Sequence, residues 1–124
     1  MRASLFVSAV KMRIDNVNTR IKIRGVDIQY HLNGTDFVWN DRKAAGNPGK
    51  HDGVTFEQAA TVFFDPLFRL VEAERNDEAR DAIIGFDALG RLLFVVHVQF
   101  EDAFIRIISA RKASNDERRD HEHF

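Results

Sequence analysis

Hydrophobic and polar residues alternate along several short stretches of the chain, a pattern that predicts β-strands. The first stretch covers residues 20–31, and Asn33-Gly34 directly after it is the strongest short hairpin signal in the sequence. Residues 35–39 should therefore return as a second strand. Further strands are expected at about residues 68–73, 80–87, 91–99 and 103–110, with the last three joined by tight antiparallel hairpins.

Helical signals lie between and after these strands. Asn40 can cap a short helix over residues 41–45, which we expect the following Gly46-Asn47-Pro48-Gly49 to end. Thr55 and Gln58 form a capping-box pattern ahead of apolar positions at helical spacing, so a second helix should begin there.

A second capping box, Ser114 with Glu117, should open a polar helix that continues to about His123. Taken together, the elements predict an α+β fold, with short N-terminal helices packed on an antiparallel β-meander and a helix at the C-terminus. We expect residues 1–35 to form an N-terminal extension with a possible edge strand, and residues 36–124 to form the main domain.

Composition narrows the class of protein. The 124 residues hold 44% apolar side chains, enough for a core, and no cysteine, which excludes a disulfide-rich secreted scaffold and thiolate chemistry. No apolar run approaches the ~18 residues that a membrane helix needs, so we expect a cytoplasmic protein without a membrane partner.

Charge is nearly balanced overall but unevenly distributed. The formal net charge is −1, whereas residues 11–24 and 103–119 carry a local positive excess and residues 72–81 a negative one. A folded domain could therefore present a basic face to an anionic partner. Ordinary solvated surface is the alternative interpretation of each cluster.

The expected hairpins allow three residues to be placed relative to one another. If Glu101-Asp102 and Ala88-Leu89 are two-residue loops, then His97 lies opposite both Arg106 and Arg80, and the three form one row across three strands. The other face of the sheet would then be the apolar face that the helices cover, carrying Leu92, Phe94, Val96, Val98, Ile105 and Ile107.

Two arginines beside a histidine favour an anion between them. Like charges on neighbouring strands are destabilising unless a group such as phosphate relieves them, and a neutral imidazole can transfer a proton. The alternative is that Arg80 pairs with an acidic residue from 72–81 while His97 is a half-buried structural histidine.

Two other clusters of polar residues indicate a binding site less strongly. Lys50-His51 lies just ahead of a capped helix and could meet an anion at its N-terminus, although such a pair is more often part of a solvated loop. His121, Glu122 and His123 have the composition of metal ligands, but the two histidines point about 200° apart on a helix, so no metal site is expected.

Several short motifs follow one another over about residues 37–119. They are Phe37-Val38-Trp39-Asn40-Asp41-Arg42-Lys43-Ala44, Asn47 with Lys50-His51, Gly53-Val54-Thr55-Phe56-Glu57-Gln58-Ala59, Phe64-Asp65-Pro66, Glu78-Ala79-Arg80 with Ile84-Gly85, Gly90-Arg91-Leu92-Leu93-Phe94-Val95-Val96-His97, and Ile105-Arg106-Ile107-Ile108-Ser109-Ala110-Arg111-Lys112-Ala113. Each motif is short, but in this order they resemble the family of BrnT toxins.

The resemblance implies a RelE-like ribonuclease toxin of a type II toxin–antitoxin system, which cleaves RNA without a metal or other cofactor and inhibits translation. Its implied catalytic residues are Arg80, Arg106 and Arg111, which stabilise charge on the phosphate, and His97, which transfers the proton. Implied phosphate contacts are Lys50, His51 and Lys112.

The implied partners are an RNA substrate and a ribbon-helix-helix-type, BrnA-like antitoxin, through which the protein would reach operator DNA indirectly. Asp52 is an insertion relative to the family pattern, which keeps open a catalytically inactive module that only docks an antitoxin. A third alternative, an unrelated small-molecule enzyme, would need a closed pocket.

Overall fold

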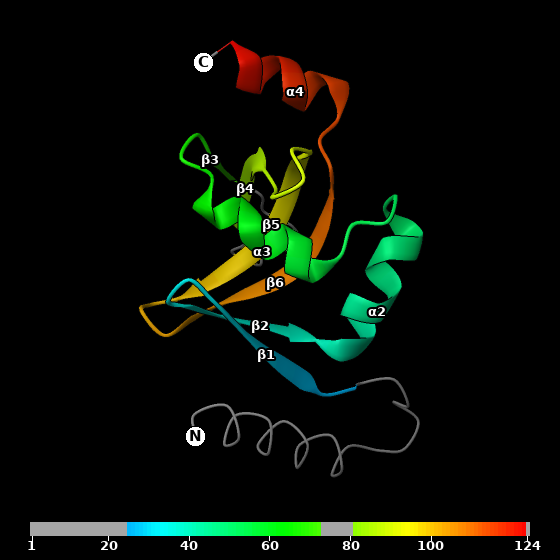
Figure 1. Ribbon diagram of the computed structural model, residues 1–124, viewed down its shortest axis with the longest axis vertical. Helices are drawn as coiled ribbons and strands as arrows, with labels where there is room; N and C mark the ends of the chain where they lie inside the picture. The colour runs from blue at the N-terminus through cyan, green and yellow to red at the C-terminus, as the bar shows by residue number, and fades with distance from the viewer. Residues whose placement is uncertain (1–24, 73–80, 124) are drawn as a thin grey trace.

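A computed structural model describes residues 25–72 and 81–123 of the chain (Figure 1). Six strands of this part form one sheet in the order β1-β2-β6-β5-β4-β3. The strands are β1 (Asp27–Leu32), β2 (Thr35–Asn40), β3 (Arg69–Glu72), β4 (Asp81–Phe86), β5 (Leu92–Phe100) and β6 (Phe104–Lys112). The helices are α2 (Asp41–Lys50), α3 (Phe56–Thr61), the 3₁₀ turn η1 (Val62–Phe64) and α4 (Asn115–Glu122). The predicted α+β class is confirmed.

The sheet is mixed rather than purely antiparallel. The β1–β2 hairpin turns at Asn33 and Gly34, which both have positive φ (49° and 82°), as the sequence predicts for a tight hairpin. Within the described sheet, β2 pairs in parallel with β6, whereas the other neighbouring strands are antiparallel. No sequence pattern predicted this parallel pair. Strand β1 lies at one edge of the described sheet and β3 at the other. The expected domain division after residue 35 stays a prediction.

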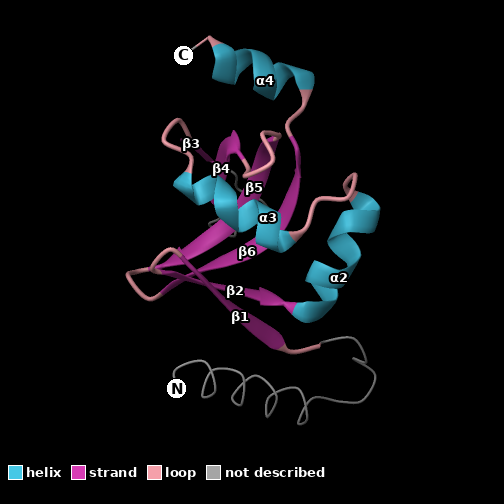
Figure 2. Cartoon of the chain, in the orientation of Figure 1, coloured by secondary structure: helices cyan, strands magenta, loops and turns pink. Residues whose placement is uncertain are grey.

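Helix α3 covers one face of the sheet, crossing in front of the central strands in Figure 2. We call this side the α3 face and the other side the far face. The core lies between the sheet and α3, where the Trp39 and Phe56 rings meet with their centroids 5.7 Å apart. The buried core cluster contains Phe37, Trp39, Val54, Phe56, Ala59, Ala60, Val62, Ile83, Leu93, Val95, Ile105, Ile107 and Ala110.

The predicted facing of β5 is wrong. Leu93, Val95 and His97 are buried on the α3 face. Because side chains alternate along a strand, the residues predicted to face the helices, which begin with Leu92 and Phe94, lie on the far face instead. The prediction for β6 is right, because Ile105 and Ile107 belong to the core.

Both assumed hairpin loops differ from the real ones. Ala103 donates to the Phe100 carbonyl (2.8 Å) and Phe100 pairs with Phe104, so the β5–β6 loop has three residues and His97 lies opposite Ile107. Moreover, a register shift follows between Val96 and His97.

The β4–β5 loop is wider than two residues because Asp87 organises it. Its carboxylate accepts from the backbone N–H of Leu89 (3.0 Å) and of Arg91 (2.8 Å) and from the Arg91 guanidinium. As a result His97 faces Asp81 across β4. The predicted row of His97 with two arginines does not form, and Arg80 lies outside the described residues.

Helix α2 continues beyond the end predicted for it and includes the Gly46–Gly49 segment. Asn47 is the reason, because its buried side-chain amide donates to the carbonyls of Val54 (2.8 Å) and Ala110 (2.9 Å). These two bonds anchor the last turn of the helix to the core. The two predicted capping boxes are both present, at Thr55 with Gln58 and at Ser114 with Glu117.

Candidate functional site on the far face

His97 is part of the core rather than of an open surface. Its side chain is buried (3% exposed) and its ring meets Phe63 edge-on, with the centroids 4.9 Å apart. Burial lowers the pKa of His97, while a weak contact with the Val95 carbonyl and the charge of Asp81 act in the opposite direction. Burial therefore favours the neutral form of the imidazole, which lies on the side of the sheet away from the arginines described next.

Arg106 has the parity of the far face, opposite Val98 of β5 and Val38 of β2. Its guanidinium donates to both carboxylate oxygens of Asp27, at 3.1 and 2.6 Å, and Asp27 is only 6% exposed. This bidentate pair fixes the Arg106 side chain in one orientation against β1.

Arg111 lies on the same face, at the end of β6 nearest α4. Its guanidinium carbon is 4.3 Å from the centre of the Phe94 ring, and it donates to the two carboxylate oxygens of Glu117 at 2.8 and 2.9 Å. The hydrogen bond from Arg111 is the main reason that the pKa of Glu117 is lowered, and the same bond raises the pKa of Arg111. Glu117 also accepts from the Ser114 backbone (2.8 Å), so one carboxylate joins α4 to the arginine.

Arg69 is an arginine of this face that the sequence pattern did not single out. The register places Arg69, Ile84, Phe94 and Arg111 in one row across β3, β4, β5 and β6. Three strand spacings, about 14 Å, separate the backbones of the two arginines. Only the true hairpin registers reveal this row, because β3 is too short for its own pattern to show which face Arg69 occupies.

The expected phosphate contacts lie elsewhere. Lys50 is in the last turn of α2, and the His51 backbone N–H donates to the Asn47 carbonyl. The N-terminus of α3 has its own cap from Thr55. Lys112 pairs with Leu93 and thus has the parity of the α3 face. Lys50, His51 and Lys112 are therefore not brought together with Arg106 and Arg111.

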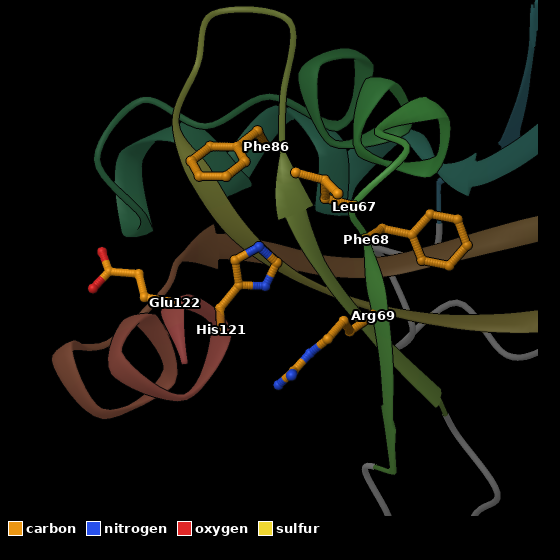
Figure 3. Close-up of a pocket in the computed structure, with 6 residues that line it drawn as sticks. All are labelled: Leu67, Phe68, Arg69, Phe86, His121 and Glu122. Carbon is orange, nitrogen blue, oxygen red and sulfur yellow. The ribbon is translucent and has the colours of Figure 1, made fainter. Parts of the chain in front are cut away.

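A pocket of about 500 Å³ lies where α4 approaches the β3 side of the sheet. Figure 3 shows the His121 ring between Phe86 and Arg69, with Glu122 directed away from it. The ring centroids of Phe86 and His121 are 5.7 Å apart. The residues that line the pocket are Leu67, Phe68, Arg69, Phe86, His121 and Glu122.

Within residues 25–72 and 81–123, no group of three or more His, Asp or Glu side chains is arranged to hold a metal. In the same part of the chain, no helix is long and apolar enough to cross a membrane.

The architecture defines a class: a mostly antiparallel six-stranded sheet with helices on one face and a C-terminal helix is consistent with the RelE-like fold of ribonuclease toxins. Comparison with family models assigns the chain within that class. The family of ribonuclease toxin BrnT, of type II toxin–antitoxin systems, matches residues 39–117, and the chain belongs to this family. No curated protein matches the chain. Membership implies an RNA substrate and an antitoxin partner.

Proposed function

We propose that this protein is an endoribonuclease toxin that cleaves RNA on the far face without a metal. Cleavage of RNA in turn inhibits translation. The observation that carries the proposal is that two guanidinium groups on this face, those of Arg106 and Arg111, are each held in one orientation by a carboxylate. They occur in a chain that belongs to a ribonuclease toxin family. Arg80, also expected to be catalytic, lies outside the described residues and keeps that role as a proposal.

The chemistry follows from what a guanidinium can do. The 2′-oxygen of one nucleotide forms a bond to the adjacent phosphorus, and the bond from phosphorus to the 5′-oxygen breaks. Water takes the 2′-hydroxyl proton and returns one to the leaving oxygen. Negative charge on the phosphate increases in the transition state, where a positioned guanidinium stabilises it.

Glu117 occupies the position at Arg111 that a phosphate would take, because both anions accept two parallel N–H bonds from the guanidinium. RNA must therefore displace the Glu117 carboxylate before Arg111 can bind the reacting phosphate.

The test is cleavage of a labelled RNA by protein purified free of antitoxin, with and without EDTA. Cleavage should survive EDTA and fall about 10²- to 10³-fold in Arg111→Ala, the loss typical of one transition-state donor. Arg118→Ala, which changes an exposed arginine of α4, is the control and should cleave normally. Cleavage that needs the metal, or full activity in Arg111→Ala, would contradict the mechanism. In cells, induction without antitoxin should arrest growth and lower translation.

A second function, docking an antitoxin without catalysis, is favoured by one observation. The guanidinium groups of Arg106 and Arg111 are each paired with a carboxylate of the same chain. We propose a ribbon-helix-helix-type, BrnA-like antitoxin as the partner in either case, with operator DNA bound through it. If the purified protein binds the antitoxin tightly and leaves RNA intact in all conditions, docking is the function.

A further inference from the structure

We infer that the pocket lined by Phe86 and His121 binds an unpaired nucleobase of the RNA substrate. The inference rests on the proposed function and extends it, because it specifies single-stranded RNA and assigns a base subsite beside the arginines of the far face.

Aromatic surface available to a base is the first observation. Phe68 and Phe86 are 40% and 36% exposed, and both line the pocket. A volume of about 500 Å³ lies in the range of small-molecule sites and is ample for one base. Any base can stack on an aromatic ring, so this surface needs no particular sequence.

An unpartnered nitrogen is the second observation. Nδ1 of His121 is shielded from solvent and has no hydrogen-bond partner in the described part of the chain. A buried polar atom without a partner is unfavourable, and a ligand that supplies one recovers the lost bond. Figure 3 shows the His121 ring among the side chains that line the pocket. Rotation of this ring would bring Nδ1 to the polar edge of a base, which offers both donors and acceptors.

Continuity with the arginines is the third observation. Arg69 lines the pocket and shares a row with Arg111 across the sheet. A strand of RNA whose base enters the pocket therefore has its phosphates on the face that carries both guanidinium groups. A base in a duplex cannot reach such a pocket unless it first leaves its stack, which costs free energy.

The experiment measures binding of a fluorescent oligoribonucleotide with 2′-O-methyl groups, which cannot be cleaved, as a single strand and as a duplex. The wild type should prefer the single strand. Phe86→Leu keeps apolar volume but removes the aromatic face, and His121→Ala removes the imidazole; each should weaken single-strand binding about tenfold. Neither should change duplex binding by more than about twofold.

The chain offers a matched control for each change. Phe100 is a similarly exposed ring stacked on Phe104 at the β5–β6 turn, and His123 is the exposed residue directly after α4, outside the pocket. Phe100→Leu and His123→Ala should bind as the wild type does. A thermal melt of each variant verifies that it is folded.

The outcomes separate the two proposals. A wild type that binds and cleaves RNA while both pocket variants keep full single-strand affinity overturns the base subsite and leaves the proposed function intact. Variants that keep RNA affinity but lose antitoxin binding would make the pocket a protein-docking site, which also overturns the inference. A wild type that neither binds nor cleaves RNA overturns both proposals.

Discussion

Replacing His97 tests whether this histidine is a core residue or a proton carrier. The ring is 3% exposed and packs edge-on against Phe63. Truncation in His97→Ala leaves a cavity, which should lower the free energy of unfolding by about 2–4 kcal/mol. For a domain of this length 1 kcal/mol corresponds to about 4 °C, so the melting temperature should fall by about 8–16 °C.

The pH dependence of stability provides a second readout for the same residue. Because burial lowers the pKa of His97 in the folded state, the unfolded chain binds a proton more readily below about pH 6.5. The folded state is thus destabilised as the pH falls from the unfolded pKa towards the lower folded pKa. His97→Leu removes this titration, so its melting temperature should fall less than that of the wild type between pH 7 and pH 5.

The assays are circular-dichroism melts across this pH range and RNA cleavage at a temperature where every variant is folded. We expect His97→Leu to cleave within about threefold of the wild type, because the side chain touches core groups and faces away from Arg106 and Arg111. If His97→Leu melts like the wild type but loses most of its cleavage, the reasoning is refuted and the imidazole carries the proton.

Three further substitutions test the far face and its support. Arg106→Ala should lower the unfolding free energy by about 1–3 kcal/mol, since it leaves the buried Asp27 carboxylate without this partner, and adding Asp27→Asn should recover part of the loss in a double-mutant cycle of melts. Glu117→Gln should raise single-strand RNA affinity two- to tenfold by freeing Arg111, on the order of one weakened charge-assisted bond; unchanged affinity would show that the Glu117 carboxylate does not compete with RNA. Asn47→Ala should cost about 2–3 kcal/mol in a denaturant titration because two buried carbonyls lose their donor, and a loss below 0.5 kcal/mol, roughly the floor for one hydrogen bond, would contradict that role.

Local signals in the sequence predicted local structure well. The Asn33-Gly34 hairpin and both capping boxes depend on residues within three positions of one another, and all three are present. The order of short motifs identified the BrnT resemblance, which the family match over residues 39–117 confirms. Element types were accordingly predictable, and so was the family.

The candidate site was less predictable because a strand's facing depends on every residue in the loop before it. One extra loop residue shifts the pairing of the strand that follows it, and here the loop organised by Asp87 precedes β5 and the three-residue loop precedes β6. His97 therefore pairs with Asp81 and Ile107 instead of with the two arginines. The end of α2 was mispredicted for a similar reason, since Asn47 is held by Ala110, 63 positions away.

The sequence by itself determined the strands, the caps and the family, because each depends on neighbouring residues or on their order. Only the tertiary structure decided which charges meet. Arg106 and Asp27 are 79 positions apart, and the parallel pairing of β2 with β6 brings their strands into one sheet. The far-face arginines and the pocket beneath α4 are made by residues from several strands and one helix. These elements lie far apart in the sequence, so the pattern within any single segment does not predict that they meet.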